Sequence, residues 1–124
     1  EGFRILEMET PGIISYWQNS YIPDQIKSIL KKVIAKRAEI SELKKRSASH
    51  ETEIKAIDTD QARIRQNMNS IDRTSELYAR YLSNLNKQEN RIEFLRKEIN
   101  RLNIEQANLN SSLTKYVDSV VIGE

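Results

Sequence analysis

The sequence predicts an all-α protein, a long antiparallel two-helix coiled-coil hairpin with a short N-terminal β-like or irregular segment at its base. No glycine or proline, the strongest helix breakers, occurs from Asp24 to Ile122. Apolar residues recur every seven positions through this stretch, and the pattern is interrupted once, near Asp72. We therefore expect an N-terminal appendage at 1–23 and a coiled-coil hairpin at 24–122, with a helix at 24–71, a turn at 72–75 and a helix at 76–122.

The appendage differs from the rest of the chain in composition. It holds both prolines and two of the three glycines. Residues 3–8 partly alternate between apolar and polar, residues 13–17 are β-branched and aromatic, and Pro11-Gly12 suits the centre of a type II turn. This pattern favours two short strands, with a loosely ordered end as the alternative. The chain opens on Glu1 rather than methionine, and we expect it to be a piece of a longer protein.

The first helix is predicted to begin at Asp24, whose carboxylate can cap the first amide groups. Ten of the fourteen positions in its two seam rows are apolar. One row contains Ile26, Val33, Ile40, Ser47, Ile54, Gln61 and Met68, and the other contains Ile29, Lys36, Leu43, His50, Ile57, Ile64 and Ile71.

The second helix is predicted to begin just after Asp72, Thr74 or Ser75, each of which can cap a helix, and to stop before Gly123. Its two seam rows contain Tyr78, Leu85, Ile92, Ile99, Gln106, Leu113 and Val120, and Tyr81, Gln88, Leu95, Leu102, Leu109 and Tyr116.

A short connection between two such helices predicts antiparallel packing. The alignment that we favour pairs Ile64 with Leu85 and places Gln61 opposite Gln88. Two buried amides could hydrogen-bond each other there and set the register, which makes this pair a candidate polar seam. A slide of one heptad is the alternative alignment, and it brings Lys36 near Gln106.

The sequence contains few of the residues and motifs that catalytic sites use. His50 is the only histidine, cysteine is absent, and no glycine-rich phosphate loop occurs. We therefore expect no enzyme, catalytic residue, metal site, cofactor or small-molecule substrate. No apolar stretch approaches the roughly 18 residues of a membrane span. The compartment stays open between cytoplasm and cell envelope.

The charge distribution raises a nucleic-acid alternative. The net charge is only +2, but residues 27–46 hold eight basic residues against two acidic ones. A basic face is what phosphate binding requires. These residues are expected to wrap around the helix, with few aromatic residues between them, so we favour a solvated surface and regard nucleic acid as an unlikely partner.

Two ends of the hairpin are candidate interaction sites. Arg73, Glu76 and Arg80 mark the tip, where a salt-bridged cluster and a surface that grips another protein are both open interpretations. The predicted salt-bridged cluster comprises Arg63, Arg65, Arg73, Arg80, Asp58, Asp60, Asp72 and Glu76. At the base, a wider apolar stripe indicates either a core on which residues 1–22 dock or a surface for a partner domain. The candidate base residues are Trp17, Tyr21, Leu30, Ile34, Val117 and Val121.

Two segments near the tip resemble a known family. The segments are Asp60-Gln61-Ala62-Arg63-Ile64-Arg65-Gln66-Asn67-Met68 and Ser75-Glu76-Leu77-Tyr78-Ala79-Arg80-Tyr81-Leu82. They are similar to the C-terminal helical region of mucoidy-inhibitor-like bacterial proteins, which carry a conserved domain of unknown function, and the resemblance is strongest over 54–102. It implies a β-rich domain before the coil, with residues 1–22 at its edge, and it implies no catalytic residues.

Together these observations predict a structural or protein-interaction module, a rigid coiled-coil arm of a larger bacterial protein. Its partner would be another protein or a second copy of itself, as a homodimer. The alternative is a nucleic-acid-binding helical arm that uses the basic flank at 27–46. A third interpretation is the accessory domain of an enzyme whose chemistry lies elsewhere.

Overall fold

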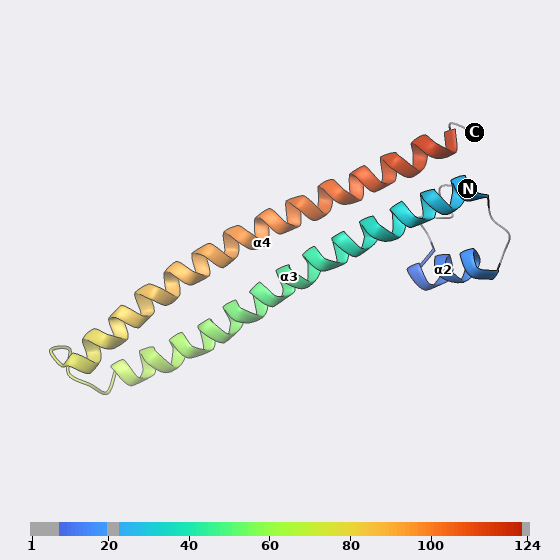
Figure 1. Ribbon diagram of the computed structural model, residues 1–124. Helices are drawn as coiled ribbons and strands as arrows, with labels where there is room; N and C mark the ends of the chain where they lie inside the picture. The colour runs from blue at the N-terminus through green and yellow to red at the C-terminus, as the bar shows by residue number, and fades with distance from the viewer. Residues whose placement is uncertain (1–7, 20–22, 123–124) are drawn as a thin grey trace. The chain divides into compact units, whose positions relative to one another are not determined.

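The computed structural model describes residues 8–19 and 23–122, and it confirms the helical hairpin (Figure 1). Its helices are α2 (Thr10–Asn19), α3 (Asp24–Met68) and α4 (Glu76–Ile122). The long helices α3 and α4 pack against each other in antiparallel directions, and the described residues contain no strand. The absence of helix breakers after Asp24 explains why each long helix runs without a break.

The prediction of a strand at 13–17 is wrong, because these residues belong to α2. The N–H of Ile13 donates to the carbonyl of Glu9 at 3.1 Å, as a helix requires. Pro11 lies in the first turn of α2, where its missing N–H costs no intrahelical hydrogen bond, so the predicted type II turn is also wrong. Burial of Ile13 outweighs the weak strand preference of β-branched residues. The other predicted strand, except for Met8, lies outside the described residues.

The chain divides into two compact units, which we describe separately. The base unit comprises residues 1–44 and 104–124, and the tip unit comprises residues 45–103. In the base unit, Ile13 of α2 is fully buried against side chains of α3 and α4. Beside it, the Arg37 guanidinium donates to the backbone carbonyl of Met8. The buried cluster of the base unit contains Ile13, Leu30, Val33, Ile40, Leu113 and Val117.

The tip unit has its own line of buried side chains, and its hydrogen bonds give the register. The Asn67 side chain donates to the Tyr81 hydroxyl at 3.3 Å, and Gln88 donates to Asp60 at 2.6 Å. A slide of one heptad would displace each pair by about 10 Å, so the favoured alignment is confirmed in this unit. The buried apolar side chains here are Ile64, Ile92, Leu95 and Leu102.

Helix α3 ends at Met68, three residues before the predicted end at residue 71. The N–H of Asn69 is shared between the carbonyls of Arg65 and Gln66, each at 3.3 Å. Such three-centre bonds tighten the last turn of a helix and satisfy its final carbonyl groups. Ile71, which continues the seam row, therefore lies in the connection and is half-buried.

Ser75 caps the start of α4 and is the residue that acts among the three predicted candidates. The N–H of Tyr78 donates to the Ser75 hydroxyl oxygen at 3.2 Å, as at a helix N-cap. The Ser75 hydroxyl in turn donates to the carbonyl of Asp72 at 2.6 Å. The Asp72 carboxylate accepts the backbone N–H and the hydroxyl of Thr74, both at 2.9 Å, and these bonds lower the pKa of Asp72.

We expect the Asp72 carboxylate to stabilise the connection at neutral pH and to lose this effect in acid. Its pKa is lower in the folded chain than the ordinary value of 3.8, so its contribution is present above that value and disappears as the pH falls through the folded pKa. Asp72→Asn keeps an acceptor oxygen without the charge. Thermal unfolding should therefore show wild type melting above Asp72→Asn at about pH 7, with the gap closing near pH 2. A gap that stays constant over this range would contradict the assignment.

Candidate functional site

The tip carries charged side chains that the rest of the unit leaves without partners. Arg73, Glu76 and Arg80 are exposed. Within residues 8–19 and 23–122, Arg63 and Asp60 form the only ion pair of the predicted cluster, at 3.0 Å. The predicted salt-bridged tip is therefore confirmed only for the pair Arg63 and Asp60, and the three candidate residues are available to another molecule.

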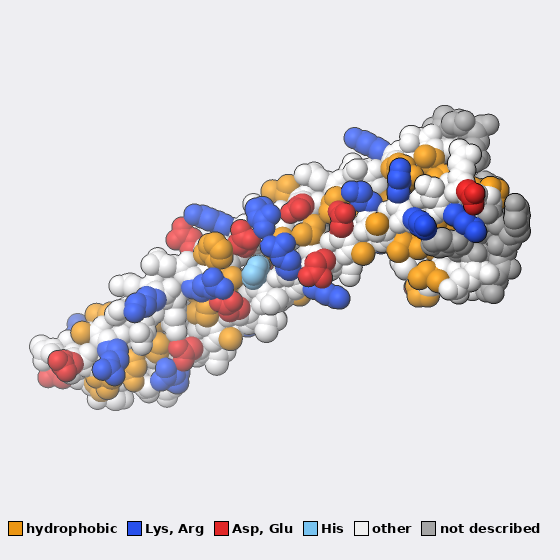
Figure 2. Space-filling view, viewed as in Figure 1, with side chains coloured by type: hydrophobic (Ala, Val, Ile, Leu, Met, Phe, Trp, Pro, Cys, Tyr) orange, Lys and Arg blue, Asp and Glu red, His pale blue; other side chains and the backbone are white. Residues whose placement is uncertain are grey.

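Apolar side chains accompany these charges at the surface. No side chain between residues 65 and 91 is buried. Leu77 is 42% exposed and Leu82 is 45% exposed, and Figure 2 shows hydrophobic side chains at the surface in this part of the tip unit. The large apolar residues of this stretch are Met68, Ile71, Leu77, Tyr78, Tyr81, Leu82 and Leu85. We call Arg73, Glu76, Leu77 and Arg80 the tip surface. Helix α4 places Leu77 three residues and Glu76 four residues before Arg80, and Arg73 lies in the connection just before this helix.

The two glutamines of the predicted polar seam do meet the opposite helix, but they do not bond each other. Gln61, which is 3% exposed, donates to Glu89 at 2.9 Å, and Gln88 donates to Asp60 at 2.6 Å. The predicted amide pair is thus wrong, since an ionised carboxylate is a stronger acceptor than a neutral amide. The pKa of Asp60 is lowered first by its hydrogen bond from Arg63 and then by the one from Gln88.

One atom of this polar layer is left without a partner. The Gln88 side-chain oxygen is buried and accepts no hydrogen bond in the described structure. An unsatisfied buried acceptor costs stability, so we expect Gln88→Leu to raise the free energy of unfolding by about 1 kcal/mol. Urea unfolding monitored by circular dichroism measures the change. The matched variant Gln61→Leu removes a buried donor that is satisfied, and it should gain less. The opposite order would contradict this account of the seam.

The predicted base residues divide between core and undescribed positions. Leu30 and Val117 are buried, and Ile34 packs against the same cluster. These three form part of the core on which α2 docks, rather than a free surface. The Trp17 and Val121 side chains and all of Tyr21 lie outside what the structure describes.

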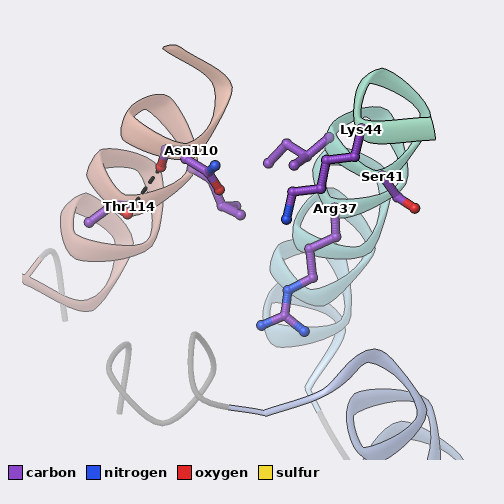
Figure 3. Close-up of a pocket in the computed structure, with 7 residues that line it drawn as sticks. Arg37, Ser41, Lys44, Asn110 and Thr114 are labelled. Carbon is purple, nitrogen blue, oxygen red and sulfur yellow. Dashed lines mark hydrogen bonds between the residues drawn. The ribbon is translucent and has the colours of Figure 1, made fainter. Parts of the chain in front are cut away.

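A notch of about 320 Å³ opens in the base unit between α3 and α4 (Figure 3). Thr114 donates to the backbone carbonyl of Asn110 at 3.0 Å, and Arg37 donates to the backbone carbonyl of Met8. No carboxylate or histidine lines the notch, so it holds no acid–base pair. Its lining residues are Arg37, Ile40, Ser41, Lys44, Asn110, Leu113 and Thr114.

The described residues provide neither a metal-binding cluster nor a membrane-spanning helix. No group of three or more histidine, aspartate or glutamate side chains is placed to hold a metal ion. In the same part of the chain, no helix combines the length and apolarity that crossing a membrane requires.

No protein-family model, no curated protein and no solved structure matches this chain. The resemblance to mucoidy-inhibitor-like proteins therefore stays a prediction based on its two segments.

Proposed function

We propose that this chain is a structural and protein-interaction module, a coiled-coil arm of a larger protein that presents its tip surface to a protein partner. The observation that carries the proposal is an exposed apolar side chain that lies beside unpaired charges at the tip. Leu77 is 42% exposed, and it is flanked by Glu76 and Arg80, which have no ion-pair partner in the described structure.

A protein partner fits this combination better than a small molecule. Protein interfaces join an apolar centre to a polar rim, and they are enriched in tyrosine, methionine and arginine. The tip offers Tyr78, Tyr81 and Met68, all half-buried, beside the exposed charges. A partner that covers Leu77 would bury apolar area and would give Arg73 and Arg80 carboxylates to pair with.

The basic flank at 27–46 gives weaker support for the nucleic-acid alternative. Lys36 pairs with Glu39 at 3.8 Å, and the Lys32 ammonium lies 5.3 Å from the centre of the Tyr116 ring. These contacts are typical of a solvated helix surface. Titration with RNA at low and high salt separates the two proposals, because phosphate-driven binding is strongest at low salt.

The test of the proposed function is a charge reversal at the tip surface, Arg73→Glu with Glu76→Lys and Arg80→Glu. Cross-linked complexes are recovered from extracts of the source cells with the wild-type chain and with this variant. We expect the triple variant to lose at least one partner protein that the wild type retains, because three rim charges then oppose the partner's charges.

The matched control reverses three exposed charges of α4 outside the tip surface, as Lys87→Glu with Lys115→Glu and Asp118→Lys. It makes the same change in charge away from the tip surface and should recover the wild-type set of partners. Recovery of the same partners by the tip variant, with both variants folded by circular dichroism, would show that the tip is not the working end.

A further inference from the structure

The notch that Figure 3 shows in the base unit differs from the notches of the tip unit in the charges around it. It has a volume of about 320 Å³, and none of the described residues that line it is an aspartate or a glutamate. In the tip unit, a notch of about 330 Å³ is lined by Glu51, and another of about 320 Å³ is lined by three carboxylates. The first of these, which we call the base notch, is therefore suited to a negatively charged ligand.

Two positively charged side chains of α3 extend into the base notch. Arg37 and Lys44 are seven residues apart, so they lie on one face of the helix, and Figure 3 shows both directed from α3 toward α4. The Arg37 guanidinium donates to the backbone carbonyl of Met8, which holds its charge at the notch. The Lys44 ammonium is exposed and forms no ion pair or hydrogen bond within residues 8–19 and 23–122.

The opposite wall of the base notch comes from α4 and supplies a neutral polar group. Asn110 and Thr114 are four residues apart on one face of this helix. The Thr114 hydroxyl already donates to the backbone carbonyl of Asn110 at 3.0 Å. The Asn110 amide extends toward α3 in Figure 3 and has no hydrogen-bond partner in the described part of the chain. Its N–H groups can therefore donate to an anion between the helices.

The floor of the base notch is apolar. Ile40 and Leu113 line it, and they are only 6% and 5% exposed. A strongly hydrated inorganic anion would lose water against these side chains and gain no apolar contact in return. A carboxylate that carries a short aliphatic chain places its charge beside Lys44 and its chain over the floor. The combination therefore favours an organic anion.

A second notch of the base unit, of about 240 Å³, is also lined by lysines and by no carboxylate of the described residues, but its lysines are already engaged. Lys36 pairs with Glu39 at 3.8 Å, and the Lys32 ammonium lies 5.3 Å from the centre of the Tyr116 ring. Both contacts would compete with a ligand. The base notch is therefore the better site for an anion.

We propose that the base notch binds a small aliphatic carboxylate. The carboxylate oxygens are held by Lys44, Arg37 and Asn110, and the chain packs on Leu113. A volume of about 320 Å³ is near the lower end of the range for small-molecule sites. Because Lys44 and Asn110 are exposed, we expect a dissociation constant of about 1 mM. This inference goes beyond the proposed function, since the tip surface takes no part in it, and it concerns binding without catalysis.

The test is an NMR titration of the full 124-residue chain with sodium hexanoate at low ionic strength. We expect saturable shifts of the Asn110 side-chain amide and of the backbone amides around Lys44. Acetate has the same charge but lacks most of the chain, so it should bind about tenfold more weakly. Hexylammonium has the chain with the opposite charge, and inorganic phosphate has negative charge without a chain. Neither should saturate these shifts over the same concentrations.

Charge substitutions then test the named residues. Lys44→Glu and Asn110→Asp each place a negative charge at the notch, and each should weaken hexanoate binding about fivefold. Both positions are exposed, so both variants should fold, as circular dichroism would verify. The matched control, Lys45→Glu, makes the same change at the adjacent exposed lysine, which is turned by about 100° on the helix and does not line the notch. It should change the dissociation constant by less than about twofold.

Three results would overturn the proposal. One is the absence of saturable shifts with hexanoate up to about 20 mM. Another is equal weakening by Lys44→Glu and Lys45→Glu, because binding would then follow the overall charge rather than the notch. The third is equal shifts with hexanoate and hexylammonium, because the cations would then play no part. None of these results depends on whether the tip surface binds a partner.

Discussion

Leu95→Ala is expected to lower the free energy of unfolding by about 3 kcal/mol. Leu95 is fully buried in the tip unit, and truncation removes apolar contacts and leaves a cavity between the helices. A two-helix coil has only one line of buried side chains, so few neighbours can move in to fill the space. Urea unfolding monitored by circular dichroism measures the loss.

The neighbouring residue provides the control. Phe94 is 50% exposed and contacts Arg91, whose guanidinium lies 5.4 Å from the centre of its ring. Phe94→Ala removes a larger side chain but should cost less than about 1 kcal/mol. Equal losses for Leu95→Ala and Phe94→Ala would mean that the seam of α4 has been assigned to the wrong face.

Ile13→Ala is expected to release α2 from the base unit, with a loss of about 2 to 3 kcal/mol of docking free energy. Ile13 is the described residue through which α2 enters the buried cluster. A ten-residue helix is marginal alone in water, so α2 should unfold when it no longer docks. Hydrogen exchange should show its amides losing most of their protection.

The adjacent Ile14 makes the matched comparison, because it has the same side chain but is 39% exposed. Ile14→Ala should change the exchange of α2 by less than about threefold, or less than about 0.7 kcal/mol. Protection of α2 that survives Ile13→Ala would show that another contact holds this helix in place.

The long helices were predictable because their signal is repeated many times. Each heptad from Ile26 to Val120 adds evidence for the same seam, and the break near Asp72 is backed by three candidate capping residues. Phe94 and Ile104 lie outside the two seam rows of the second helix, and both are exposed in the structure. The end of α3 was misplaced by three residues because Ile71 fits the seam equally well in a helix or in the connection.

The errors arose where a single local signal competed with tertiary packing. Residues 13–17 have β-branched and aromatic side chains, which favour a strand. Burial of Ile13 in the base cluster stabilises the helix by more than this local preference opposes it. Gln61 and Gln88 were placed at one level correctly, but the choice between an amide and a carboxylate acceptor depends on side-chain directions that a heptad pattern does not contain.

Whether the charges of the tip surface are paired also depends on side-chain positions, which the structure gives and the sequence does not. Glu76 and Arg80 have the spacing of a helical ion pair, but such a pair gains little at an exposed site, and the structure leaves both residues unpaired.

The central claim is that α3 and α4 fold back on each other with Ile64 at the level of Leu85. Oxidation of the double variant Ile64→Cys with Leu85→Cys tests it most directly, with Ile57→Cys and Leu85→Cys as the pair that a one-heptad slide would bring together. We predict rapid cross-linking within one molecule for the first pair and little for the second, as measured by mass spectrometry under non-reducing conditions. Cross-linking of the second pair in preference to the first, or bonds formed only between molecules, would contradict the hairpin described here.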